Sequence, residues 1–295
     1  MIPECSSCIV SSLQMLIPLL TDDEGEQMRF FTYAYNRIAE GFEKKLEPVL
    51  LSIGLYQELY QMGNKTDPYR DIKDRSIRAA EKALPIIELE IRKFQGYDRL
   101  RAALSASIAG NLIDFNTAYH KPDLETLSEV FHSIMREGFA LDDSESLWQI
   151  LNSFQGHAVI LADNAGETHF DLPLLEVMKD LGWKMTYVVK MKPMINDATR
   201  DDITGSRIEE LADIADNGGW AHGVPRSYVS HEFLELVASC DLVLSKGQAN
   251  VETFPEIQRE LNINTFYIIR AKCPHIAQAA GGKVGDNIVL QIPAR

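Results

Sequence analysis

The chain has 295 residues, 45% of them hydrophobic and 24% charged, a composition that excludes a disordered or fibrous protein. Its formal net charge is −14, from 43 acidic and 29 basic residues. Such a surface repels phosphate backbones, so neither DNA nor RNA is expected as a partner.

The beginning of the chain does not resemble a secretion signal. It lacks a cationic start, contains Glu4 and is interrupted by Pro18. No segment approaches the roughly 20 apolar residues that a membrane span needs. We therefore expect a cytoplasmic protein that does not associate with membranes.

Cys5 and Cys8 have the C-x-x-C spacing that suits zinc or redox chemistry, but no second pair of this kind follows. With Cys240 and Cys273 they are too few for a disulfide framework in a chain of this length. Two reduced thiols on an N-terminal helix are the simpler interpretation, and the role of the pair stays open.

The first half of the chain is predicted to be helical, because its apolar residues recur at helical intervals. Candidate helices cover residues 26–42, 71–94, 98–115 and 123–135. Pro85 predicts a kink or a break in the second of these. We predict a helical N-terminal domain over residues 1–155 that packs on the rest of the chain and closes the site.

After about residue 155, short β-branched runs alternate with helical patterns. Candidate strands are 157–162, 184–190, about 219–223, 241–245, 264–270 and 288–292. Candidate helices are 168–181, 206–216, 250–261 and 273–280. The alternation predicts a doubly wound, mostly parallel sheet in an α/β/α sandwich, and so a Rossmann-like domain over residues 156–295. The continuous apolar runs fit strands that are covered on both faces.

Polar residues follow several of the predicted strands. Asp163 and Asn164 come after the first strand, and Asp197 lies in the loop after the second. Lys246 and Lys272 follow two later strands. Ligands of open α/β sheets bind beyond the carboxyl ends of the strands, so we expect these side chains to meet at one edge.

The oxygen atoms in this set suit a hard divalent cation such as Mg²⁺ or Mn²⁺. Asp163 and Asn164 can reach one ion only at an irregular turn, which Gly166 makes feasible. Asp197 is a suitable third ligand. Lys246 precedes a glycine and a predicted helix N-terminus, an arrangement that binds anions. A cation and lysines facing one cavity indicate phosphoryl chemistry.

Each motif also has a purely structural interpretation. A turn with a helix cap explains the residues around Asp163, and an N-cap explains Asp197. Lys246 is compatible with a solvated loop, and Asn111 and Asp114 with the polar end of a helix. The placement of these residues at one sheet edge favours function over this interpretation.

The chain resembles the metal-dependent damage-control phosphatases, whose eukaryotic branch is called acidic-residue methyltransferase-like. The resemblance spans almost the whole chain, and Cys5-x-x-Cys8 and Asp67-Pro68-Tyr69 indicate the mainly archaeal branch. The motifs that carry it are Gly110-Asn111-x-x-Asp114, Asp163-Asn164-Ala165-Gly166-Glu167-x-x-x-Asp171, Asn196-Asp197-Ala198-Thr199, Lys246-Gly247-x-x-Asn250 and Arg270-Ala271-Lys272-Cys273.

The resemblance implies an α/β/α domain after a helical portion, with Mn²⁺, Mg²⁺, Co²⁺ or Ni²⁺ at the carboxyl edge of the sheet. By position, the metal ligands would be Asp163, Asn164 and Asp197. Lys246 and Lys272 would contact the phosphate.

Four further residues receive roles from the same resemblance. Asn111 and Asp114 would close the pocket and contact the substrate or metal-bound water. Glu167 and Asp171 would face the substrate or orient the metal ligands. Which of Lys190 and Lys192 faces the site is left open.

The implied activity is hydrolysis of phosphomonoesters of small metabolites, sugar phosphates or damaged cofactors among them. Metal-activated water would attack the phosphorus, and Asp114 or Asp163 would accept its proton. Attack by an aspartate carboxylate is disfavoured, because position 165 is alanine where aspartyl phosphatases have a second aspartate.

Two other functions stay open. A methyltransferase that uses S-adenosylmethionine to modify carboxylates would need a glycine-rich turn after the first strand, where this chain has only Gly166 and an acidic cluster. A non-enzymatic protein that binds phosphorylated metabolites is the other. The physiological substrate, the native metal and the oligomeric state are not determined by the sequence.

Overall fold

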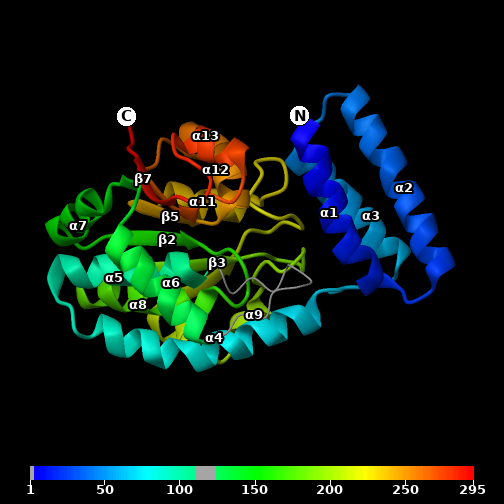
Figure 1. Ribbon diagram of the computed structural model, residues 1–295. Helices are drawn as coiled ribbons and strands as arrows, with labels where there is room; N and C mark the ends of the chain where they lie inside the picture. The colour runs from blue at the N-terminus through cyan, green and yellow to red at the C-terminus, as the bar shows by residue number, and fades with distance from the viewer. Residues whose placement is uncertain (1–2, 111–123) are drawn as a thin grey trace.

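The computed structural model describes residues 3–110 and 124–295. Within these ranges a seven-stranded sheet lies between two layers of helices, and three N-terminal helices stand to one side of it (Figure 1). The helices are α1 (Pro3–Leu20), α2 (Glu24–Glu43), α3 (Pro48–Met62), α4 (Arg70–Ile91), α5 (Gly96–Gly110), α6 (Leu124–Glu137), α7 (Ser144–Ser153), α8 (Thr168–Asp180), α9 (Arg200–Ile203), α10 (Ile208–Leu211), α11 (His231–Ala238), α12 (Gln248–Leu261) and α13 (Pro274–Ala280).

The sheet has the strand order β1-β7-β6-β5-β2-β3-β4. Its strands are β1 (Leu141–Asp142), β2 (His157–Leu161), β3 (Lys184–Val189), β4 (Asp213–Asp216), β5 (Leu242–Lys246), β6 (Thr265–Arg270) and β7 (Asn287–Ile292). All neighbours are parallel except β6 and β7. The predicted α/β class with a doubly wound, mostly parallel sheet is confirmed.

Helices cover both faces of the sheet, which explains the continuous apolar strands. Along β2, Ala158 and Ile160 join the core formed with α4, α5 and α8. Val159 and Leu161 join the opposite core, formed with α11 and α12. The alternation of side chains along one strand therefore supplies both cores, and it fixes which face each later residue meets.

The N-terminal helices α1–α3 form a hydrophobic core of their own, which Met194 and Ala221 complete from two loops of the α/β part. Helices α4–α7 instead share the core of the sheet. The hydrophobic cores therefore separate α1–α3 from the rest and do not mark a boundary at residue 155. The predicted division of the chain into domains at that residue stays a prediction. Among residues 3–110 and 124–295, none of the helices has an apolar stretch sufficient to span a bilayer.

Two local expectations differ from the structure, and a third differs in part. Helix α4 does not break at Pro85, because this residue lies on the exposed side, where water can hydrate the carbonyl that loses its partner. The kink expected at Pro85 stays a prediction. The predicted helix 206–216 is short and gives way to β4, which pairs with β3. Residues 219–223 form no strand, since Gly218 and Gly223, which flank and end this stretch, have positive φ angles.

Candidate functional site

The loops after β2 and β3 are joined to one another by backbone hydrogen bonds. The Ala198 amide donates to the Asp163 carbonyl at 2.8 Å, and the Ala165 amide donates to the Asn196 carbonyl at 2.9 Å. Asn164 and Asp197 form a β-bridge between these bonds. The structure thus brings Asp163, Asn164 and Asp197 together, and their roles as metal ligands stay predictions.

The side chain of Asp163 lies directly against Gly247, at the start of α12. A Cβ atom built on Gly247 would lie 2.0 Å from the Asp163 carboxyl carbon, so only glycine fits there. Gly247 has φ +80° and ψ 163°, a region open essentially to glycine alone. The positive end of the α12 dipole is therefore beside the Asp163 carboxylate, where it stabilises negative charge.

A buried acidic cluster occupies this edge of the sheet. Asp163 is 8% exposed, Glu167 2% and Asp197 4%. Burial, together with the Glu167 and Asp197 carboxylates, raises the pKa of Asp163 well above its usual value, while Lys272 and Lys190 act in the opposite direction. The site holds more negative charge than its lysines balance locally, and a cation is the partner that would relieve it.

Lys190, and not Lys192, faces this cluster. The Lys190 ammonium lies 3.4 Å from an Asp197 carboxylate oxygen and donates to the Ala162 carbonyl at 3.1 Å. Lys192 is exposed and its ammonium lies over the Trp220 ring, 5.5 Å from the centroid. The sequence left open which of these two lysines faces the site. The turn after β3 directs Lys190 toward the acidic cluster and Lys192 toward Trp220.

Lys246 is held on the other side of the site as half of a buried ion pair. Its ammonium contacts the Asp171 carboxylate and donates to the Ser107 carbonyl in the last turn of α5 at 3.2 Å. Asp171 also accepts hydrogen bonds from the Ser107 hydroxyl at 2.6 Å and the Tyr187 hydroxyl at 2.7 Å. Burial and the Asp171 carboxylate raise the pKa of Tyr187, which keeps this donor protonated.

The remaining predicted residues lie at the same edge or outside the described ranges. Glu167 accepts a hydrogen bond from the Asn164 side-chain amide at 2.5 Å. Lys272 is exposed after β6, its amide donates to the Gln248 side chain at 2.7 Å, and its charge acts on Asp163. Asn111 and Asp114 lie outside the residues that the structure describes.

Helix α4 supports both loops of the site, which the sequence did not predict. Gly166 packs so closely on α4 that a Cβ atom there would lie 2.8 Å from Ser76 Cβ. Lys73, which is fully buried, forms an ion pair with Asp202 at 3.0 Å. Asp202 in turn accepts from the Thr199 amide at 2.8 Å and from its hydroxyl at 2.7 Å, which fixes the loop that carries Asp197.

Helix α3 fixes the same loop from the N-terminal side. Ile195 has φ +52°, an outlier for a β-branched residue. Its amide donates to the Tyr60 hydroxyl at 3.0 Å, so α3 holds the strained residue in place. Strain of this kind beside Asp197 is typical of a functional loop.

The described donors fit a divalent cation by their chemistry. Within residues 3–110 and 124–295, no three His, Cys, Asp or Glu side chains are grouped to hold a metal, so Asn164 would complete the set with Asp163 and Asp197. The Asn164 amide nitrogen faces Asp163 at 3.3 Å and Glu167 at 2.5 Å. Rotating the amide by half a turn would present its oxygen to a cation instead.

The chain matches the sequence model of the damage-control phosphatase ARMT1-like domain over residues 1–288. It is 31% identical over 290 residues to an uncharacterised protein of Methanocaldococcus jannaschii, and the match covers 98% of this chain and 94% of the relative. It is 28% identical over 287 residues to a damage-control phosphatase of Archaeoglobus fulgidus, with 97% of each chain covered.

A solved structure shares the fold over nearly the full length. The crystal structure of a DUF89 family protein from Pyrococcus horikoshii superposes with a TM-score of 0.87 at 27% sequence identity, covering 99% of this chain and 98% of the other. In sequence, the damage-control phosphatase PH1575 of that organism is 29% identical over 276 residues, which are 93% of this chain and 92% of the relative. This chain therefore belongs to the family of damage-control phosphatases with an ARMT1-like domain.

Proposed function

We propose that the protein is a metal-dependent phosphatase that hydrolyses phosphomonoesters of small metabolites, damaged ones among them. The observation that carries the proposal is the meeting of Asp163 and Asp197 in a buried acidic cluster beside Lys190 and Lys272. Carboxylates and ammonium groups at the carboxyl edge of a parallel sheet suit the recognition of a phosphate through a divalent cation.

Asp163, Asn164 and Asp197 are the residues that would hold the cation. When bound, Mn²⁺, Mg²⁺, Co²⁺ or Ni²⁺ would supply a Lewis acid for a phosphoryl oxygen and for a water molecule. The burial of the Asp163 and Asp197 carboxylates favours tight coordination of the ion, because few water molecules can reach these carboxylates and solvate their charge in its place.

Side chains of the protein would bind the phosphate, stabilise its charge and accept the proton. Lys272 would attract the substrate phosphate, since its exposed side chain is at the rim of the site. Lys246 would stabilise charge on the phosphoryl oxygens from the side of α5, where Asp171 now orients its ammonium. Asp163, or Asp114 outside the described residues, would take the proton of the attacking water.

A phosphate-release assay tests this proposal. The purified protein is given p-nitrophenyl phosphate and a panel of sugar phosphates, with each of the four metals or with a chelator. We expect release that requires metal, and a loss of more than about a hundredfold in Asp163→Asn and Asp197→Asn, exceeding what supporting residues around metals usually cost. Asp201→Asn, an exposed aspartate on α9, is the control that should keep its activity.

The other outcomes separate the competing functions. Release that persists in chelator, or that survives Asp163→Asn, would contradict the proposal. Transfer of a methyl group from S-adenosylmethionine to a carboxylate would favour the methyltransferase. Binding of a sugar phosphate without turnover at any metal would favour a non-enzymatic protein. Calorimetric titration with Mn²⁺ gives a second readout, in which Asp163→Asn should bind the ion more weakly.

A further inference from the structure

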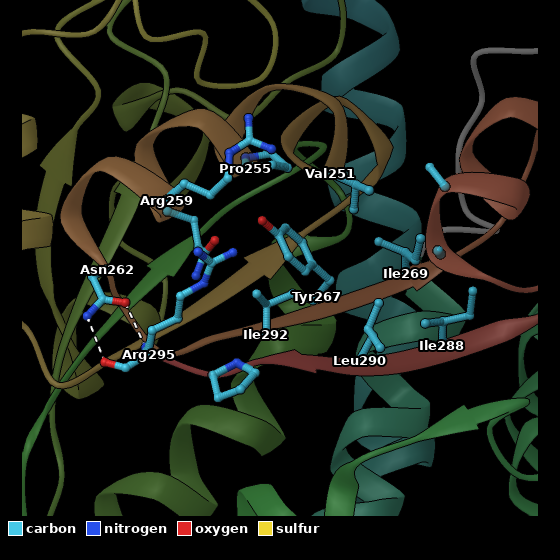
Figure 2. Close-up of a pocket in the computed structure, with 14 residues that line it drawn as sticks. Val251, Pro255, Arg259, Asn262, Tyr267, Ile269, Ile288, Leu290, Ile292 and Arg295 are labelled. Carbon is cyan, nitrogen blue, oxygen red and sulfur yellow. Dashed lines mark hydrogen bonds between the residues drawn. The ribbon is translucent and has the colours of Figure 1, made fainter.

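A cavity of about 380 Å³ lies between α12 and the strands β6 and β7. None of the residues that form its wall is one of the predicted metal or phosphate ligands. Figure 2 shows that its wall is built by α12 on one side and by β6, β7 and the end of the chain on the other. The volume lies within the range of small-molecule pockets.

The cavity exists because the helix layer over β7 is incomplete. Helix α13, which follows β6, has only seven residues. The second half of β7 is therefore poorly covered: Leu290 is half-buried, and Ile292 is 37% exposed. Ile269 and Ile288 continue this apolar floor at one end of the pocket (Figure 2).

The other end of the pocket is polar and cationic. Arg259, Asn262 and Arg295 lie there, and the Tyr267 hydroxyl points toward the same end (Figure 2). The Asn262 side chain holds the backbone of Arg295 through two hydrogen bonds, of 2.7 and 3.2 Å. These two hydrogen bonds fix the position of Arg295 in the wall of the pocket.

Tyr267 is buried without the partner that a phenol needs. It is 5% exposed, and its hydroxyl makes no hydrogen bond to any described residue. Burial raises the pKa of Tyr267 although Arg259 acts to lower it, so the hydroxyl is a neutral donor. An unpartnered buried hydroxyl costs stability that a ligand oxygen would restore.

The two arginines add permanent positive charge without an acidic partner. No ion pair among the described residues involves the Arg259 or Arg295 side chain. Their guanidinium groups bind carboxylates through paired, charge-assisted hydrogen bonds.

We propose that this pocket binds a small aliphatic carboxylate. The hydrocarbon tail would lie on Ile269, Ile288 and Leu290. The carboxylate would accept hydrogen bonds from the Tyr267 hydroxyl and from Arg259 or Arg295. A flat partner surface fits less well, since Tyr267 as a whole is only 5% exposed and its hydroxyl lies inside a concave wall, where only a slender group fits.

Octanoate is the probe for a calorimetric titration of the intact protein, with octan-1-ol and inorganic phosphate as comparison ligands. We expect octanoate to bind at least about tenfold more tightly than octan-1-ol, because only the carboxylate gains charge-assisted bonds. Phosphate should not bind here, because it has no apolar body. Arg259→Gln and Arg295→Gln should each weaken octanoate binding by about tenfold. Arg29→Gln, which changes an exposed arginine on α2, should not affect it.

Tyr267→Phe separates a ligand contact from a structural role. The variant should weaken octanoate binding, yet keep or raise the thermal stability of the free protein, since it removes an unpartnered polar atom. Tyr35→Phe, at a tyrosine that is 49% exposed, is its matched control and should change neither quantity.

Four results would overturn the proposal: no octanoate binding, binding equal to that of octan-1-ol, octanoate binding unaffected by Arg259→Gln and Arg295→Gln, or a dimer whose formation excludes the probe. None of these measurements uses phosphatase activity. A negative octanoate titration would therefore not argue against the proposed phosphatase function. A negative phosphate-release assay would likewise not argue against carboxylate binding in this pocket.

Discussion

At the scale of single residues, the position of Asp163 depends on the absence of a side chain at Gly247. The carboxylate occupies the space where any other residue would place its Cβ atom. The glycine thus serves two purposes, since it adopts a positive φ angle and it lets α12 begin against the carboxylate. The motif Lys246-Gly247 is therefore a steric requirement of the site as well as a turn.

Gly247→Ala should lower phosphatase activity by about a hundredfold, because the new methyl group displaces the Asp163 carboxylate. Gly281→Ala is the control. Gly281 has a similar φ of +83°, but a Cβ atom there meets nothing within 4 Å. It should lose about 1 kcal/mol of unfolding free energy and keep its activity. Equal activities of the two variants would contradict the steric explanation.

At the scale of elements, α4 connects the loops of the site through one buried charge. Lys73 is fully buried, and its ammonium lies 3.0 Å from one Asp202 oxygen and 3.5 Å from Asp67. Arg70 approaches the other Asp202 oxygen at 2.7 Å. These bonds tie α4 to α9 directly after the loop that carries Asp197, so α4 acts as a support for the site and not only as a cover of the sheet.

Lys73→Met should lower the free energy of unfolding by about 3–5 kcal/mol, because it leaves the Asp202 carboxylate buried without its main partner. Chemical denaturation measures the change. Lys93→Met breaks an exposed ion pair with Glu90 and should have little effect. If both variants were equally stable, the proposed support by α4 would be wrong.

The ion pair between Lys73 and Asp202 also makes the free energy of unfolding depend on pH in acid. Burial would raise the pKa of Asp202, but Lys73 and the Thr199 donors outweigh it and hold this pKa below its usual value. The pair therefore stabilises the fold fully above the ordinary aspartate pKa of about 3.9, and the stabilisation is lost as the pH falls toward the lowered pKa. In Lys73→Met this part of the acid dependence should shrink.

At the scale of the whole molecule, α3 connects the N-terminal helices to the α/β part. The Ser52 hydroxyl is 2.8 Å from the His222 ring, and the Gln57 side chain donates to the Trp220 carbonyl at 2.5 Å. Figure 1 shows α1–α3 beside the ends of the strands, where the loops after β3 and β4 lie. The cluster α1–α3 is thus attached at the edge of the sheet that carries the candidate site.

This attachment should weaken in acid through His222. Burial lowers the pKa of His222 to about 4, although Asp197 acts to raise it, and Lys190 lowers it further. The unfolded chain takes up this proton near pH 6.5 and the folded chain only near pH 4, so stability falls as the pH falls between these values.

The loss through His222 should reach about 3 kcal/mol by pH 4. Denaturation curves of His222→Gln should vary less over this pH range than those of the wild type. His231→Gln, at an exposed histidine paired with Glu235, is the control and should follow the wild type. A wild-type stability that does not change between pH 6.5 and 4 would contradict the assignment.

Much of the fold was predictable because it follows from local sequence patterns, namely apolar runs for strands and helical periodicity for helices. Five of the six predicted strands are confirmed within one or two residues, since buried parallel strands need continuous apolar runs. The predicted helices at 26–42 and 168–181 are confirmed within the same margin. The sixth strand, at 219–223, failed because β4 is a short edge strand with a half-exposed pattern, and glycine geometry decided the turn after it. Such edge strands have little periodicity for a sequence to show.

The sequence by itself determined that Asp163, Asn164 and Asp197 would meet, because parallel strands bring their carboxyl ends to one edge. Only the tertiary structure decided which groups surround them. Lys190 and Lys192 are two residues apart, so strand alternation assigns them to the same face, and the turn beyond β3 separates them. The pairing of Lys73 with Asp202 joins residues 129 positions apart. Contacts at such separations depend on how helices pack, and helix packing is a property of the assembled core that no local pattern encodes.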